Sequence, residues 1–154
     1  MLVFCSPNIK VFIMGTIRRL KNKRKVFVVD DNSMCREAMS NDLKQIDNIE
    51  VSTFSSAELC LKSMNENPEL IILDFYLDGE NPENINGHFA LERFRNTEQC
   101  PKILFVSSAI NEELLLEYSN HRDVDFMLKS IYGSKSLIRK VEEKLSEVKS
   151  HQIL

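Results

Sequence analysis

The stretch VFVVDDN at residues 26–32 joins four apolar residues directly to two acids. A short, unbroken apolar run is typical of a strand that is buried on both faces of a parallel sheet. The acids Asp30 and Asp31 then stand at the carboxyl end of that strand, where binding sites form in open α/β sheets. The stretch therefore predicts a buried first strand with a candidate site directly after it.

From residue 26 onward, strand and helix patterns alternate along the chain. Apolar residues after the first strand recur every three to four positions, which predicts a helix that carries Cys35, Ala38, Met39, Leu43 and Ile46. Further apolar runs, each followed by a helical pattern, predict strands at residues 49–54, 69–75, 102–109 and 124–130. Five strand–helix units predict an α/β domain whose five-stranded parallel sheet is doubly wound, with helices on both faces.

Polar residues mark the expected starts of two of these helices. Ser55 is followed three positions later by Glu58, which is the spacing of a capping box. Asn111 precedes the fourth helical pattern and is a suitable N-cap. We therefore expect helices to begin just after Ser55 and Asn111.

The composition is typical of one soluble domain with a hydrophobic core, since 43% of the 154 residues are apolar and 28% are charged. The apolar runs are far shorter than the roughly 18 residues that a membrane-spanning helix needs. We expect a domain over residues 25–149, a poorly ordered N-terminal extension over residues 1–24 and a C-terminal tail over residues 150–154. We expect no association with a membrane.

Charge is distributed unevenly along the chain. Residues 1–25 contain seven of the 20 Lys and Arg residues and none of the 23 Asp and Glu residues, so the remainder has a net charge of −10. A body of that sign repels nucleic acid, and we expect no direct DNA binding by the domain. The basic stretch at residues 18–25 is interpreted as a solvated arm.

The four cysteines are scattered and form no C-x-x-C pair, and the three histidines are equally dispersed. The sequence therefore holds no zinc-ligand spacing. Isolated cysteines of this kind favour reduced thiols in a cytoplasmic protein.

Side chains that could bind a metal or react stand at the ends of four of the five predicted strands. They are Asp30, Asp31, Asp74, Ser107, Ser108 and Lys129. Three carboxylates at one sheet edge repel one another, and a divalent cation with oxygen ligands, Mg²⁺ or Mn²⁺, relieves that repulsion. A lysine and a serine hydroxyl beside such an ion suit phosphoryl oxygens. The set therefore predicts phosphoryl transfer with a carboxylate as nucleophile.

This ordered set resembles the receiver domain of two-component response regulators over roughly residues 25–149. The spacings fit as well, with 43 residues from Asp31 to Asp74 and 22 residues from Ser107 to Lys129. The resemblance implies a flavodoxin-like sheet with strand order 2-1-3-4-5. We expect a stand-alone receiver, since only residues 150–154 follow the last predicted helix.

The resemblance implies a role for each residue of the set. Asp74 is the implied phosphoacceptor, Asp31 the direct Mg²⁺ ligand and Asp30 a ligand through metal-bound water. The other implied roles are a metal-binding backbone carbonyl for Tyr76, a switch hydroxyl for Ser107, a small residue whose N–H reaches the phosphate for Ser108, a phosphate-pairing cation for Lys129 and a switch aromatic for Phe126.

The resemblance also implies partners. A sensor histidine kinase or a phosphotransfer protein would donate the phosphoryl group, and a downstream protein would read the phosphorylated state. We expect a monomer or a phosphorylation-dependent dimer. We expect no enzymatic turnover beyond the domain's own phosphorylation and dephosphorylation.

Two departures from the family pattern keep an alternative open. Ser130 stands where the family usually has a proline after the lysine, and the loop between Asp74 and Gly87 is about five residues longer than usual. That loop adds Asp78, Glu80 and Glu83, which we expect to be solvated. The alternative is a receiver-like interaction module that takes no phosphate. A phosphatase is disfavoured, because Asp74-Phe75-Tyr76 lacks a second acid two residues after the nucleophile.

Overall fold

The computed structural model describes residues 23–77, 87–98, 100–110, 112–118, 120–129 and 133–147. Strands and helices alternate along the chain, as the apolar periodicity predicts. The strands are β1 (Arg24–Val29), β2 (Ile49–Phe54), β3 (Leu70–Asp74), β4 (Lys102–Ser107) and β5 (Val124–Leu128). The helices are α2 (Ser33–Leu43), α3 (Ala57–Lys62), α4 (Gly87–Arg95), α5 (Glu112–Tyr118) and α6 (Ser134–Ser146), with a short 3₁₀ helix, η1 (Met64–Glu66).

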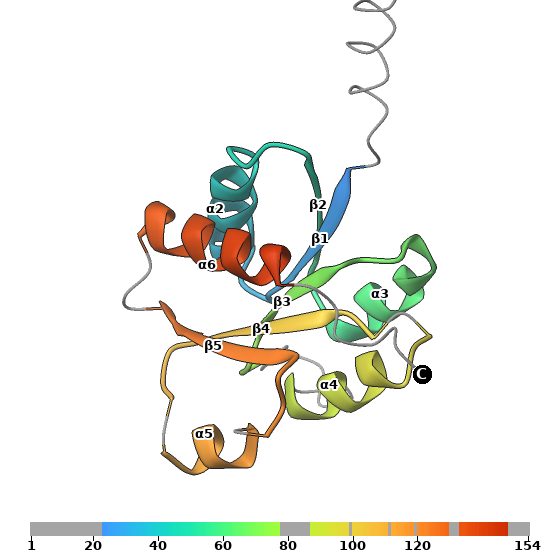
Figure 1. Ribbon diagram of the computed structural model, residues 1–154, viewed down its shortest axis with the longest axis vertical. Helices are drawn as coiled ribbons and strands as arrows, with labels where there is room; N and C mark the ends of the chain where they lie inside the picture. The colour runs from blue at the N-terminus through green and yellow to red at the C-terminus, as the bar shows by residue number, and fades with distance from the viewer. Residues whose placement is uncertain are drawn as a thin grey trace, which may run out of the picture.

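The five strands form one parallel sheet in the order β2-β1-β3-β4-β5 (Figure 1). This confirms the predicted fold class and strand order. In the register of the central strands, Val29 of β1 pairs with Leu73 of β3, and Asp74 of β3 pairs with Val106 of β4. The carboxyl ends of these strands therefore lie at one edge of the sheet.

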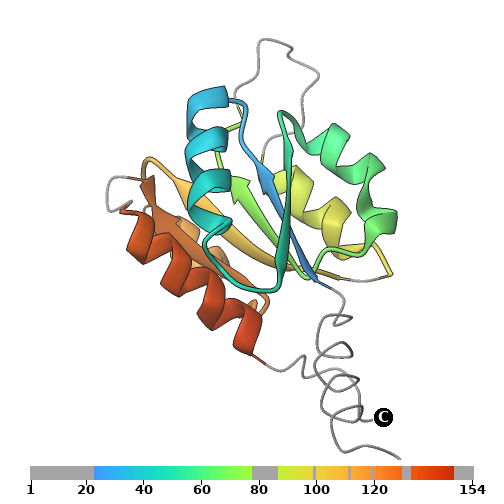
Figure 2. The same cartoon turned by 90° about the horizontal axis from the view of Figure 1, so that it is seen from above.

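Each face of the sheet has its own hydrophobic core. Phe27 and Val29 of β1 pack in the core that includes side chains of α3, α4 and α5. Val26 and Val28 pack in the core that includes side chains of α2 and α6. Figures 1 and 2 show α2 and α6 on one side of the sheet and α3 and α4 on the other. Because both faces are covered, the central strands carry unbroken apolar runs, at residues 26–29, 70–73 and 103–106, rather than alternating patterns.

One of the two predicted helix caps lies one residue away from its expected position. The N-cap of α3 is Ser56, whose hydroxyl accepts from the Leu59 N–H at 3.3 Å, so the predicted cap at Ser55 was wrong by one residue. Asn111, the expected cap of α5, lies outside the described residues. β4 also ends at Ser107, two residues before the expected end.

The basic stretch does not extend as a solvated arm to residue 25. Arg24 is the first residue of β1, pairs with Glu69 Oε2 at 2.8 Å and donates to the carbonyl of Leu145 in α6. Lys25 pairs with Glu66 at 3.1 Å. Both cations are therefore part of the folded domain, and residues 18–22 lie outside the described residues.

In the part of the chain that the structure describes, no helix is both long enough and apolar enough to cross a membrane. The longest, α6, has 13 residues. This agrees with the short apolar runs of the sequence.

Candidate functional site

Three carboxylates converge at the carboxyl edge of the sheet. Asp30 follows β1, and Asp74 is the last residue of the neighbouring strand β3. Asp30 is fully buried, Asp74 is 4% exposed and Asp31 is exposed. One oxygen from each carboxylate lies within 4.8 Å of the other two. The structure thus brings together the three acids that the sequence places at the ends of two strands.

Lys129 joins this cluster from the end of β5. Its Nζ lies 2.7 Å from Asp74 Oδ2 and 3.0 Å from Asp30 Oδ2. Burial pulls the pKa of Lys129 down, but its contacts with Asp74 and Asp30 outweigh that effect and hold the pKa above its ordinary value. Lys129 is therefore a protonated counter-ion for two buried carboxylates.

The same environment perturbs Asp74. Burial raises its pKa, Lys129 opposes that rise through a hydrogen bond and its charge, and the charge of Asp30 adds to it. The net direction is upward, because one ammonium does not offset burial beside a second carboxylate. A further cation would favour the ionised form of Asp74.

The other carboxylate oxygens of the cluster determine which cation could bind there. Asp74 Oδ1 accepts from the Tyr76 N–H at 3.2 Å, and Asp30 Oδ1 accepts from the Asn32 N–H at 2.9 Å. Asp30 Oδ2 is buried and has the ion pair with Lys129, but it accepts no well-aligned hydrogen bond from the described residues. Three carboxylates with one lysine leave a net charge of −2, and oxygen-only ligands suit a hard divalent cation such as Mg²⁺.

The two serines after β4 lie differently from each other. Ser107 is buried, and its hydroxyl donates to the Ala109 carbonyl at 2.6 Å and accepts from the Ala109 N–H at 3.3 Å. Ser108 is exposed in the turn that follows. Among the described residues, neither serine has a hydrogen bond to Asp74, so their roles toward a phosphoryl group stay predictions.

An aromatic column leads from the acid cluster toward α5. Phe75, which follows Asp74, contacts Phe105 at a ring distance of 5.2 Å, and Phe105 stacks on Phe126 at 5.3 Å. Tyr118 of α5 contacts Phe126 at 5.6 Å, and its hydroxyl hydrogen-bonds to His88 of α4. The family resemblance singles out Phe126, whereas apolar periodicity does not distinguish Phe105 and Tyr118 from other core residues.

Gly87 is a site residue that the sequence suggests only as a helix start. Its N–H donates to the Phe75 carbonyl at 3.2 Å. A Cβ at this position would lie 2.7 Å from the Phe75 carbonyl oxygen and 2.9 Å from that of Asp74. The first residue of α4 therefore packs directly on the backbone that carries Asp74, and only glycine fits there.

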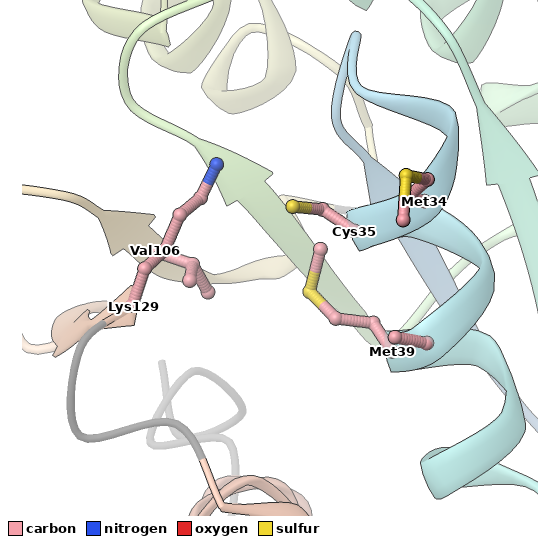
Figure 3. A pocket seen from close by; sticks show the side chains of 6 residues that line it. Met34, Cys35, Met39, Val106 and Lys129 are labelled. Carbon is pink, nitrogen blue, oxygen red and sulfur yellow. The ribbon is translucent and has the colours of Figure 1, made fainter.

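An apolar cavity of about 240 Å³ lies beside the cluster. Figure 3 shows Cys35 and Met39 of α2 on one side of it and Val106 and Lys129 on the other. Met34 and Ala38 complete its lining. Lys129 therefore contacts both the carboxylate cluster and an apolar cavity.

Several predicted features lie outside the described residues. They are Ser130, which replaces the usual proline, and the loop acids Asp78, Glu80 and Glu83. Tyr76 is described, and its N–H contacts Asp74, but metal binding by its carbonyl stays a prediction.

The response regulator receiver domain family matches residues 26–142 of the chain. The chain belongs to this family. Membership of this family is consistent with two-component signalling. Receiver domains generally bind Mg²⁺ at an acidic pocket, and Asp30, Asp31 and Asp74 form a cluster of acids here. No curated protein sequence matches the chain.

Solved receiver structures share the fold of this receiver. The BeF3-activated DrrB receiver domain of Thermotoga maritima has a TM-score of 0.67 at 22% identity, over 81% of this chain and 99% of that one. A CheY-like receiver protein from Methanospirillum hungatei has a TM-score of 0.66 at 21% identity, over 80% and 94%. The chemotaxis protein CheY4 of Vibrio cholerae has a TM-score of 0.67 at 20% identity, over 79% and 98%. At these identities the likeness establishes the fold alone.

Proposed function

We propose that this receiver accepts a phosphoryl group on Asp74 from a phosphohistidine of a sensor kinase or a phosphotransfer protein. The observation that supports this most strongly is the position of Asp74. Its carboxylate is almost fully buried at the end of a central strand, 2.7 Å from Lys129, with oxygens of Asp30 and Asp31 within 4.8 Å. This arrangement combines a nucleophile, a fixed cation and a set of metal ligands.

The chemistry balances without a further reactant. A carboxylate oxygen of Asp74 attacks the phosphorus, an O–P bond forms, and the P–N bond of phosphohistidine breaks with its electron pair moving to the imidazole nitrogen. Lys129 already contacts Asp74 and can pair with an oxygen of the transferred group. Mg²⁺, held by Asp30, Asp31 and Asp74, would neutralise the charge of the phosphoryl oxygens.

The phosphorylated state would be read through a change of shape. The Ser107 hydroxyl would exchange the Ala109 carbonyl for a phosphoryl oxygen, while Lys129 holds another. Charge-assisted hydrogen bonds contribute about 1.5–3 kcal/mol each, so two of them approach the roughly 5.5 kcal/mol that moves a population from 1:99 to 99:1. We propose that α5, β5 and α6 form the surface that responds, because Phe126 of β5 packs between Phe105 and Tyr118 of α5.

Labelling by this route is stoichiometric. Each chain would carry one phosphoryl group on Asp74 and pass the signal to a downstream protein by binding rather than by turnover. Tyr76 stands where a phosphatase of this nucleophile type needs a second acid, so we propose no catalytic cycle on phosphomonoesters.

Intact-protein mass spectrometry after incubation with Mg²⁺ and either acetyl phosphate or phosphoramidate tests the proposal. Phosphoramidate contains a P–N bond, as phosphohistidine does. Wild type is expected to gain one phosphoryl group, whereas Asp74→Asn and wild type with excess EDTA gain none. Absence of uptake from both donors would contradict the proposal and favour an interaction module that takes no phosphate.

A further inference from the structure

The geometry points to Arg36 as the residue that positions the Asp30–Asp31 pair for metal binding. The inference rests on the proposed function, since it concerns the same acids. Arg36 lies in the first turn of α2, and its Nη1 donates to the Asp30 carbonyl at 2.5 Å and approaches the Asp31 carbonyl at 3.3 Å. One guanidinium group therefore contacts the main chain of both acids.

These carbonyls have few other partners. They stand between the end of β1 and the start of α2, and no backbone N–H among the described residues donates to either one. Backbone carbonyls in folded proteins are nearly always paired, so the contacts of Arg36 complete the hydrogen bonding of this turn. The turn that carries Asp30 and Asp31 is thereby tied to the first turn of α2.

The two acids depend on this tie to different degrees. The Asp30 carboxylate is held independently, by the Asn32 N–H at 2.9 Å and by Lys129 at 3.0 Å. The Asp31 carboxylate is exposed, and no hydrogen bond or ion pair to another described residue fixes it. Its position toward the cluster is therefore set by its own main chain, which Arg36 holds.

Arg36 stands at a position of α2 where a positive charge is not otherwise favoured. The first turn of a helix carries the positive end of the helix dipole, which disfavours a cation. The first turn of α2 also contains no acid that could pair with it. The contacts with the two carbonyls give this arginine a role at a place where the helix dipole disfavours a cation.

Two possible roles of Arg36, as a nearby positive charge and as a hydrogen-bond donor that holds the main chain, predict opposite effects on metal affinity. If Arg36 acts only as a nearby positive charge, its removal would let Mg²⁺ bind more tightly. If Arg36 positions the main chain, its removal would weaken binding, because the Asp31 oxygen would no longer be held near Asp30 and Asp74. Loss of a residue that orients metal ligands typically weakens metal binding about 10- to 100-fold.

Isothermal titration with Mg²⁺ separates these two cases. We expect Arg36→Gln to raise the dissociation constant about tenfold. Arg36→Lys keeps the charge but loses the planar fork, and it should also bind Mg²⁺ more weakly than wild type. Arg93→Gln, which removes an exposed cation from α4, is the control for net charge and should bind as wild type does. Unchanged or tighter binding in Arg36→Gln, or wild-type affinity in Arg36→Lys, would overturn the inference.

Two further readings keep the outcome unambiguous. Thermal melts in EDTA show whether the variants are folded at the titration temperature. Electron paramagnetic resonance with Mn²⁺ measures ion binding by a method that does not depend on the heat of binding. A purely structural arginine would lower the melting temperature and leave the affinity of the folded variant unchanged. If wild type itself binds neither ion, the proposed metal site fails, and that result is distinct from a failure of the Arg36 variants alone.

Discussion

Lys129 Nζ lies between two buried carboxylates, 2.7 Å from Asp74 Oδ2 and 3.0 Å from Asp30 Oδ2. The three residues come from the ends of three different strands, so this contact exists only in the completed sheet. Both carboxylates share one ammonium, which leaves the cluster with excess negative charge. The stability of the fold and the binding of a cation are therefore linked at this place.

Lys129→Met is expected to destabilise the protein by about 3 kcal/mol at pH 7 in EDTA, because it leaves two buried carboxylates without a counter-ion. The pKa of Lys129 is raised in the folded state, so the stabilisation is fully present at pH 7 and is lost only as the pH rises through that raised pKa. Urea unfolding measures the difference. Lys140→Met is the control. Lys140 pairs with the partly exposed Asp125, and loss of this ion pair should lower the free energy of unfolding by about 1 kcal/mol or less. Equal losses in the two variants would contradict the prediction.

Gly87→Ala is expected to lower stability by about 1–3 kcal/mol and to reduce Mg²⁺ affinity. The added Cβ would lie 2.7 Å from the Phe75 carbonyl oxygen, so the backbone beside Asp74 must move. The matched control is Gly133→Ala, where a Cβ meets nothing within 4 Å. Thermal melts and Mg²⁺ titration of both variants provide the comparison. If Gly87→Ala has the same melting temperature and Mg²⁺ affinity as Gly133→Ala, the prediction is wrong.

The Arg95–Asp123 pair should contribute stability in a pH-dependent way. Burial raises the pKa of Asp123, but its hydrogen bonds with Arg95, at 2.8 and 3.0 Å, outweigh that effect and hold the pKa below 3.8. Because the folded-state pKa is lowered, the contribution is present above about pH 4 and is lost as the pH falls through the folded-state pKa. Asp123→Asn should therefore cost about 1–2 kcal/mol at pH 7 and less at pH 3 in urea unfolding. A cost that is the same at both pH values would rule this explanation out.

The convergence of the acids and Lys129 could be predicted from the sequence because it needs only the strand ends. In a parallel sheet the carboxyl ends share one edge, so Asp30, Asp74 and Lys129 are brought together by topology whatever their rotamers. The continuous apolar run at residues 70–73 identifies a strand buried on both faces for the same simple reason.

Contacts that depend on side-chain direction could not be predicted. Periodicity does not distinguish Ser55 from Ser56 as a helix cap, because that choice depends on the local backbone. Arg24 belongs to a run of charges in the sequence, and its partners Glu69 and Leu145 lie 45 and 121 positions away. The contact of Arg36 with two carbonyls is local, but it depends on a side chain that turns back from the helix.

The phosphorylated form is expected to lose its phosphoryl group slowly. The bulky Tyr76 stands two positions after Asp74, and Ala109, two positions after Ser107, has no polar group to orient an attacking water. A half-life well beyond seconds should be observed by intact mass after removal of the donor. Tyr76→Asn should shorten it several-fold, and decay of wild type within seconds would refute the prediction.

The identity of the modified residue tests the central claim most directly. Borohydride reduction of the phosphorylated protein converts an aspartyl phosphate to homoserine, and peptide mass spectrometry then locates that residue. We predict homoserine at position 74, dependent on Mg²⁺ during phosphorylation. Homoserine at position 30 or 31 instead, or phosphorylation of a side chain other than aspartate, would contradict the account of Asp74 as the phosphoacceptor.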